Sequence, residues 1–304
     1  MERDFQISSR MGMGAGLALT IAVAVVCGSP SSVFATFHLM QIEQAIAGVN
    51  GDTTVQAIQL RTRSSFQNFV AGARIHAWDA NGENPVLILD IPTDVANTAS
   101  GARILIASPD FPAHTSPAAV LNFTMTNLIP ESYLAAGSLT FEDDFGDPGT
   151  IVYWRLSWGG ASYTGSTTGD LSNDLNGDFG PPFGGPLPSS SLQALKFQGA
   201  ATARSTTNLA DYALTAGAAV FNNTSGTSFT VIPPPPEPGD IDGDGDVDTA
   251  DLMHLVECMP GPEIGTPPLE CEHDHFHAAD LDGDDDVDLQ DFAEFQNLFP
   301  GVQP

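Results

Sequence analysis

Basic side chains are scarce in this chain of 304 residues, which has 9 Lys and Arg against 38 Asp and Glu and a formal net charge of −29. The last basic residue is Arg204, and residues 239–304 contain 19 acidic side chains with no Lys or Arg. This charge excludes a nucleic-acid backbone or an anionic membrane surface as a partner, because both would be repelled. It favours cations as ligands of the C-terminal part.

Long apolar runs are also missing, apart from one near the N-terminus. Arg3 and Arg10 precede an uncharged run over residues 11–26, and small residues then lead to a V-x-A site that ends at Ala35. This pattern is typical of a signal peptide cleaved after Ala35. The alternative is a single membrane anchor, although a span needs about 20 apolar residues. We therefore expect a secreted protein, extracellular or at the cell surface, with no membrane span after cleavage.

Cysteine is rare, and cleavage after Ala35 would leave only Cys258 and Cys271. In an oxidising compartment two cysteines at this spacing favour a disulfide. Closing so short a loop would contribute about 3 kcal/mol to stability. The alternative is a transition-metal site in residues 271–277, where histidines alternate along a segment expected to be extended.

Familiar catalytic motifs are absent: the sequence contains no G-x-S-x-G, H-E-x-x-H or glycine-rich phosphate loop. We therefore expect a non-catalytic binding or structural body. The alternative is a glycoside hydrolase, which cleaves O-glycosyl bonds with two carboxylates. Its acids would come from residues 142–147, and its sugar-stacking rings from Tyr153, Trp154 and Trp158. The acidic run is more typical of a solvated turn, and the rings alternate as in a half-buried strand.

The region between residues 36 and 232 has the pattern of a β protein. Short apolar segments alternate with turns rich in Gly, Asn, Asp and Pro, and the 42% of apolar residues in the chain suffices for a core. We predict a mainly β fold with an antiparallel β-sandwich or jelly-roll body. The expected strands are residues 55–61, 73–78, 85–91, 102–107, 120–125, 138–141, 151–158, 194–197 and 228–232. Residues 40–47 have a helical pattern, and residues 159–191 are expected to form surface loops.

A proline-rich segment over residues 233–238 separates this body from a C-terminal module, residues 239–304. Such a segment cannot enter a sheet or helix and stays extended as a stiff spacer. The start of the body is similar to exported Ig-like domains of the lamin-tail type, without a motif that would assign residues. The chain is thus divided into a signal peptide (1–35), a β-sandwich-like domain (36–232), a linker (233–238) and the module.

The module contains one 12-residue pattern twice, D-x-D-G-D-x-D-V-D-x-x-D, over residues 240–251 and 280–291. In such a loop, oxygens from positions 1, 3 and 5 converge on a hard cation. Position 7 offers a backbone carbonyl, position 9 often acts through water, and position 12 closes the shell. Crowded carboxylates repel one another unless a divalent ion neutralises them. The pattern predicts two Ca²⁺ sites, formed by Asp240, Asp242, Asp244, Asp246, Asp248, Asp251, Asp280, Asp282, Asp284, Asp286, Asp288 and Asp291.

Each loop is followed by a short amphipathic run, which predicts a helix. The apolar residues expected on one face of these two helices are Leu252, Leu255, Val256, Phe292, Phe295, Leu298 and Phe299. No helix is expected before either loop. The small α-helical module is therefore a loop–helix unit that occurs twice, and Val247 and Val287 at position 8 are expected to pair the two loops.

This duplicated half of an EF-hand resembles the type I dockerin family over residues 239–300. The resemblance implies two bound Ca²⁺ ions, with side-chain ligands at positions 1, 3, 5, 9 and 12 of each loop. Asp246 and Asp286 would lie at the backbone-carbonyl position. It also implies docking to a cohesin-like scaffold or cell-surface protein, and a link to polysaccharide.

The sequence departs from the family pattern in the second loop and at the partner-selecting positions. Asp285 stands where a glycine normally makes the sharp turn, so we expect about 1 kcal/mol of strain there. Positions 10 and 11, which help to choose a cohesin in the family, differ between the repeats: residues 249–250 are Thr-Ala and residues 289–290 are Leu-Gln. A third acidic stretch, residues 174–178, lacks the closing acid and favours a surface turn.

Overall fold

The structure is a computed structural model that describes residues 37–145, 148–233, 238–243 and 247–299. The expected signal peptide lies outside these residues, as do most of the proline-rich linker and the loop residues Asp244 and Asp246. Within the described part, no helix is both long and apolar enough to cross a membrane.

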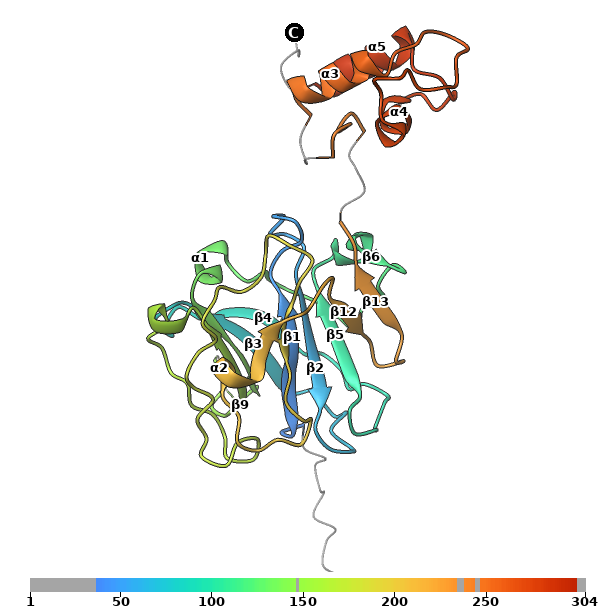
Figure 1. Cartoon of the computed structure of the whole chain (residues 1–304). Helices are drawn as coiled ribbons and strands as arrows, with labels where there is room; N and C mark the ends of the chain where they lie inside the picture. The colour runs from blue at the N-terminus through green and yellow to red at the C-terminus, as the bar shows by residue number, and fades with distance from the viewer. Residues whose placement is uncertain (1–36, 146–147, 234–237, 244–246, 300–304) are drawn as a thin grey trace, which may run out of the picture. The chain divides into compact units, whose positions relative to one another are not determined.

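The fold is mainly β, as the sequence predicts, and it contains three sheets (Figure 1). The six-stranded sheet has the order β11 (Tyr212–Leu214), β10 (Leu195–Phe197), β1 (Met40–Ile46), β2 (Ala57–Thr62), β5 (Arg103–Ala107) and β7 (Phe123–Thr124). The four-stranded sheet has the order β4 (Val86–Asp90), β3 (Ala73–Trp78), β8 (Gly137–Asp143) and β9 (Val152–Trp158). The three-stranded sheet has the order β12 (Val220–Asn222), β13 (Ser228–Val231) and β6 (Thr115–Ser116). All neighbouring strands are antiparallel except β5 and β7.

The six-stranded sheet is buried on both faces. Ile58 of β2 belongs to a core shared with the four-stranded sheet, where Trp154 of β9 is fully buried. The preceding residue, Ala57, points to the opposite face and joins a second core that contains Phe221 and Phe229 of the three-stranded sheet. Alternation along the strand therefore supplies both cores, and each large side chain buried in them contributes about 1.5–3 kcal/mol.

All nine expected strands coincide with observed ones, but the helix expected over residues 40–47 is wrong. These residues form β1, every residue of which is buried. The pairing of β1 with β2 shifts between Ile42 and Gln44, which marks a β-bulge. The bulge inserts one residue into the strand, so the apolar positions change from a spacing of two to the spacing of a helix.

The region of residues 159–191 forms loops, but they are not confined to the surface. Phe179 and Leu187 are buried in the core beneath the four-stranded sheet, and the ring of Phe179 lies 4.9 Å from that of Trp154. The Gly-rich and Ser-rich composition correctly indicates irregular backbone. It does not reveal which apolar side chains return to the core.

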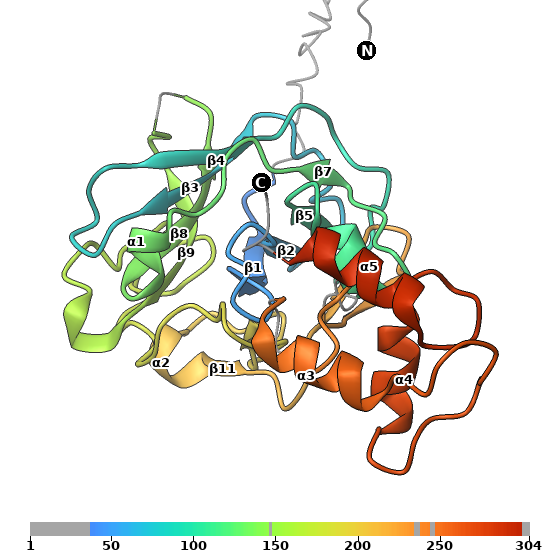
Figure 2. The same ribbon diagram turned by 90° about the horizontal axis from the view of Figure 1, so that it is seen from above.

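Short helices complete the body: α1 (Glu131–Leu134), α2 (Asn208–Asp211), and two 3₁₀ turns at Phe111–His114 and Gly160–Ser162. The C-terminal module contains α3 (Thr249–Glu257), α4 (His273–Ala279) and α5 (Leu289–Leu298) (Figure 2). Its own core includes Leu255, Phe276 and Phe295, one residue from each helix. The helices after the two loops match the prediction, whereas Val256 and Leu298 are exposed. The expectation that no helix precedes either loop is wrong for the second loop, because α4 ends directly before it.

Candidate metal centre

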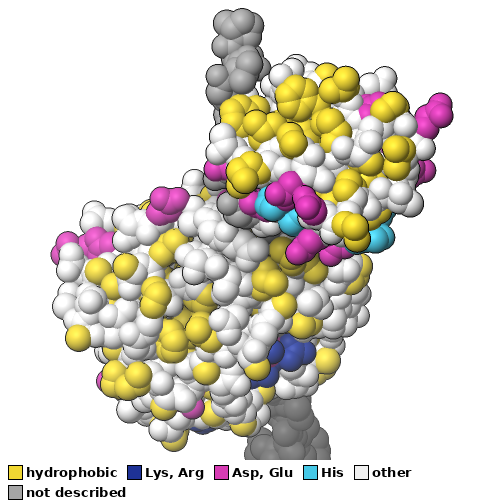
Figure 3. Space-filling view, turned by 45° about the horizontal axis from the view of Figure 1, so that its top comes forward, with side chains coloured by type: hydrophobic (Ala, Val, Ile, Leu, Met, Phe, Trp, Pro, Cys, Tyr) yellow, Lys and Arg dark blue, Asp and Glu magenta, His cyan; other side chains and the backbone are white. Residues whose placement is uncertain are grey.

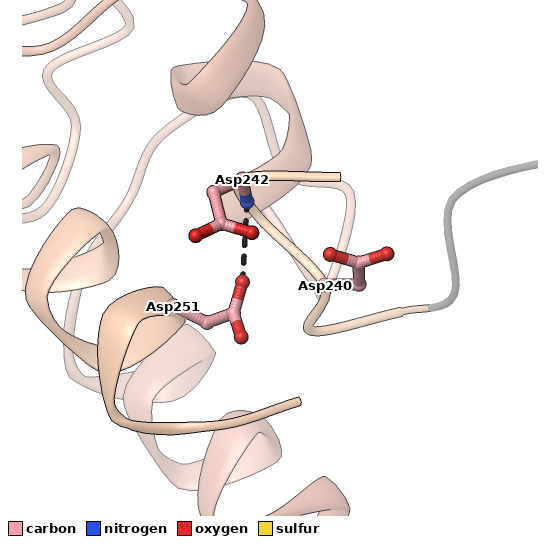
Figure 4. Close-up of side chains that lie close together, drawn as sticks. All are labelled: Asp240, Asp242 and Asp251. Atoms are coloured by element: carbon pink, nitrogen blue, oxygen red, sulfur yellow. Dashed lines mark hydrogen bonds between the residues drawn. The ribbon is translucent and has the colours of Figure 1, made fainter. Parts of the chain in front are cut away.

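The first acidic loop is closed by a carboxylate at the start of α3. Oδ1 of Asp251 accepts the backbone N–H groups of Ile241 at 2.6 Å and Asp242 at 3.1 Å. Figure 4 shows the hydrogen bond from Asp242. Oδ2 of the Asp251 side chain accepts the N–H of Asp248 at 2.8 Å. Asp251 is fully buried. Position 12 of the loop thus joins its two ends.

The second loop repeats this arrangement. Asp291 is fully buried, and its Oδ1 accepts the N–H of Leu281 at 2.7 Å and that of Asp282 at 3.2 Å. Its Oδ2 accepts the N–H of Asp288 at 2.8 Å. Each corresponding distance agrees within 0.1 Å between the loops. The sequence duplication is therefore also a duplication of hydrogen bonds.

Position 9 of each loop begins the following helix. The carboxylates of Asp248 and Asp288 accept the N–H of Ala250 and Gln290, each at 2.6 Å. With Asp251 and Asp291 they form reciprocal capping boxes at α3 and α5. Such a cap contributes about 1 kcal/mol, which explains why the helices begin where they do.

The structure brings some of the predicted ligands together and separates others. Asp240, Asp242 and Asp251 each place an oxygen within 4.8 Å of the others in the first loop. In the second loop, by contrast, the ligands fall into two groups. The first group is Asp280, Asp282 and Asp284, and the second is Asp286, Asp288 and Asp291.

These groups offer only oxygen donors, which suit a hard divalent cation such as Ca²⁺. Asp286 adds a more specific observation in the second loop. Its Oδ2 accepts the N–H of Glu263 at 2.5 Å, and its buried Oδ1 has no hydrogen-bond partner. A buried oxygen without a donor is costly, and a nearby cation would satisfy it. The residues present therefore fit calcium.

Two predicted local contacts differ from expectation. No strand pairs Val247 with Val287 among the described residues; instead the carbonyl of Val287 accepts the N–H of Gly261 at 3.4 Å. At position 11 of the second loop, Nε2 of Gln290 donates to Oδ2 of Asp282 at 2.9 Å. The Gln290 side chain is therefore engaged within its own loop.

Crowding of negative charge raises the pKa of two loop carboxyls. Desolvation and the charges of Asp284 and Asp291 raise the pKa of Asp282. For Asp286, the hydrogen bond from the N–H of Glu263 lowers the pKa. Desolvation and the neighbouring aspartates raise it by a larger amount, so the net shift of the pKa is upward. The loop without a cation therefore favours protonation of its own side chains.

Calcium is expected to reverse the pH dependence of the module's stability. Without calcium, the folded state binds protons more tightly than the unfolded state at Asp282 and Asp286. Its free energy of unfolding should therefore rise as the pH falls from neutral towards the ordinary carboxyl value of 3.8. With calcium, protons compete with the ion and the same change should destabilise the module. Thermal melts followed by helical circular dichroism, in chelator and in calcium, test this.

Asp282→Asn serves as the control for that reversal, because it removes one of the two shifted carboxyls. It should flatten the dependence measured in chelator. Parallel slopes with and without calcium would contradict the prediction.

Asp285 adopts the left-handed conformation expected at position 6, with a φ of 70°. Asp285→Gly should raise the free energy of unfolding of the module by about 1 kcal/mol, because glycine adopts this conformation without strain. Urea unfolding followed by circular dichroism measures the change. Asp285→Asn removes the charge but keeps a side chain, so it separates strain from repulsion. Equal gains from the two variants would show that strain is not the cause.

Cys258 and Cys271 are joined by a disulfide with a Cα–Cα distance of 4.9 Å. It connects the end of α3 with the segment just before α4. The expectation that residues 271–277 are extended is wrong, because His273–Ala279 is helical. Phe276 and Ala279 are buried in the module core, which accounts for this helix.

The acidic run of the body is not the solvated turn that the sequence favours. Glu142 and Asp143 end strand β8 and are fully buried. Oε1 of Glu142 contacts Nδ1 of the buried His76 and accepts the N–H of Gly149 at 3.1 Å. Asp143 accepts the N–H and hydroxyl of Thr150 at 2.6 and 2.9 Å. Asp147, which belongs to the same run, lies outside the described residues.

The aromatic side chains considered for sugar stacking are buried or half-buried in the body. Trp154 and Trp158 are fully buried, and Nε1 of Trp154 donates to the hydroxyl of Tyr212 at 2.9 Å. Tyr153 is half-buried, with its ring 5.5 Å from that of Phe37. Burial therefore excludes Trp154 and Trp158 as an exposed sugar-stacking surface.

The third acidic stretch is a turn whose first carboxylate is buried and whose Leu175 is exposed. Asp174 is fully buried and accepts the N–H and hydroxyl of Thr206 at 2.7 and 2.9 Å. Asp178 accepts the hydroxyl of Thr167 at 2.6 Å. The carboxylates of Asp174 and Asp178 thus connect this turn to the segments that contain Thr206 and Thr167.

The chain was compared with known proteins. No protein-family model matches it, and a search of curated proteins finds no similar sequence.

Proposed function

We propose that the C-terminal module binds two Ca²⁺ ions and that the protein acts outside the cell as a docking component with a non-catalytic β-rich body. One observation carries this proposal: Asp251 and Asp291 close two acidic loops with the same set of backbone hydrogen bonds. A solvated acidic extension would not form the same set of hydrogen bonds twice. The dockerin resemblance of residues 239–300 agrees with it.

The aspartates of each loop would have two different roles. Aspartates at positions 1, 3 and 5 would supply side-chain oxygens, and positions 9 and 12 would hold the loop and start the helix. The module would therefore fold most stably when its carboxylates are neutralised. Calcium supplies the positive charge that offsets their repulsion. Binding and folding are coupled in this mechanism, because only the folded loop brings the oxygens together.

Docking is supported by apolar side chains that the module leaves in solvent. Met253 and Val256 of α3 and Leu289 of α5 are exposed by 64%, 58% and 74%. Large contiguous patches of exposed apolar side chains mark interaction surfaces. The partner would be a cohesin-like scaffold or cell-surface protein that recognises the folded, calcium-loaded helices.

Calorimetric titration of the full chain with calcium tests the first part of the proposal. We expect two binding events, of which Asp240→Ala removes one and Asp280→Ala the other. Glu294→Ala, which removes an exposed charge on α5, should leave both events unchanged. A titration without binding heat, or one that both loop variants leave intact, would disprove calcium binding by the loops.

Retention on an immobilised type I cohesin domain tests the second part. The full chain should be retained in calcium and released by a chelator, and Val256→Asp should weaken retention. If the chain binds calcium but is never retained, docking to this type of partner is wrong while the calcium sites stand.

A further inference from the structure

Four of the seven histidines in the chain lie in the module, on helices α3 and α4. Calcium prefers oxygen ligands, so these imidazole side chains are not expected to bind it. Figure 3 shows histidine side chains next to acidic ones on the molecular surface. Imidazole nitrogen is instead the common ligand of zinc, copper and nickel ions.

The helical conformation of residues 273–279 sorts these histidines into two pairs. His273 and His277 are one turn apart and lie on the same face of α4. Their ring centroids are 4.7 Å apart. His275 lies on a different face of α4, where its ring centroid is 4.5 Å from that of His254 in α3. The second pair therefore connects two helices that are far apart in sequence.

The separation of His254 and His275 suits a shared metal ion. With Zn–N bonds of about 2.0–2.1 Å, a ring centroid lies about 3.2 Å from the metal, and two tetrahedral ligands have centroids about 5 Å apart. The observed 4.5 Å is close to this value. Torsions that turn one nitrogen of each ring towards a common point would allow both rings to bind one ion.

The structure also holds this pair in position. The disulfide between Cys258 and Cys271 joins the end of α3 to the start of α4, and Leu255 and Phe276 bury the adjoining faces of both helices. Pairing of the two helices therefore precedes ligand binding, which lowers the entropy cost of assembling a site. By contrast, His273 and His277 both lie on α4 and are exposed.

An acidic side chain completes the surroundings of His254. The Oε2 atom of Glu257 lies 3.5 Å from Nδ1 of His254. A carboxylate behind an imidazole is the usual partner of a metal-binding histidine, because it orients the ring and leaves Nε2 for the metal. Among the described residues no carboxylate makes a comparable contact with His275, so water would complete the coordination shell.

We propose that His254 and His275 bind a divalent transition metal of the zinc class, at a site separate from the two acidic loops. One ion held by both rings would link α3 to α4 beside the disulfide. The inference does not rest on calcium binding, because it needs only the contact between these two helices.

Zinc titration of the full chain, in calcium at a concentration that saturates the carboxylates, tests the proposal. We expect one zinc ion per chain. His254→Gln and His275→Gln should each lower its affinity by about tenfold or more, because each removes half of the protein ligands. His273→Gln and His277→Gln are matched controls and should leave the affinity unchanged. Circular dichroism of each variant checks that the helices remain folded.

The disulfide provides a second, independent arm. Cys258→Ala combined with Cys271→Ala keeps all four histidines but removes the link between the helices, so zinc affinity should fall. Loss of binding in the His273 and His277 variants, equal loss in all four, or no zinc binding by the original chain would each overturn the assignment. A calcium titration run in parallel shows whether the loops function regardless of that result.

Discussion

Asp251→Ala is expected to abolish calcium binding by the first loop and to destabilise the C-terminal module by about 3 kcal/mol. The side chain is fully buried and accepts three backbone N–H groups, two of which belong to the other end of the loop. Each buried donor left without an acceptor costs about 1–3 kcal/mol. A destabilisation of about 3 kcal/mol lowers the folding equilibrium constant of the module about 100-fold.

The chain contains convenient probes for this experiment. Every Trp and Tyr lies in the body, before residue 213, whereas the body's α-helices have only four residues each. Tryptophan fluorescence therefore reports on the body, and helical circular dichroism reports mainly on the module. Asp251→Ala should change only the latter.

Asp291→Ala should produce the same loss in the second loop, since its hydrogen bonds are equivalent. Glu294→Ala, which removes a carboxylate without removing a loop contact, is the charge-matched control. If Asp251→Ala retains two calcium ions and full helicity, the loop closure that we infer is wrong.

Glu142→Ala is expected to destabilise the body by about 3 kcal/mol, because each buried polar group that loses its partner costs about 1–3 kcal/mol. Glu142 is fully buried, and its Oε1 contacts both His76 and the N–H of Gly149. Urea unfolding followed by tryptophan fluorescence measures the effect. Glu142→Gln retains the shape and one acceptor, so it should cost less.

The same variants separate a structural role from a catalytic one. Asp144 lies two residues further along and is only partly buried, so Asp144→Ala should leave the stability of the body nearly unchanged. A reducing-sugar assay on polysaccharide completes the test. If Glu142→Ala abolished a measurable turnover while leaving stability intact, the glycoside hydrolase interpretation would replace the structural one.

Local features were readable directly from the sequence. The spacing of aspartates in residues 240–251 and 280–291 predicts the loops, because each loop's hydrogen bonds join residues at most ten positions apart. Short strands were readable for the same reason, since alternation is a property of neighbouring residues. The strand β1 was misread because its bulge changes that alternation, and only the pairing with β2 reveals the bulge.

The positions that depend on distant contacts were decided by the tertiary structure alone. Glu142 is a buried partner of His76 because β8 pairs with β3, a fact that no local pattern contains. His254 meets His275 because the module core and the disulfide hold α3 against α4. Local sequence thus determined which groups could bind a hard cation. Packing determined which carboxylates became structural and which histidines came together, because burial and proximity depend on the whole fold.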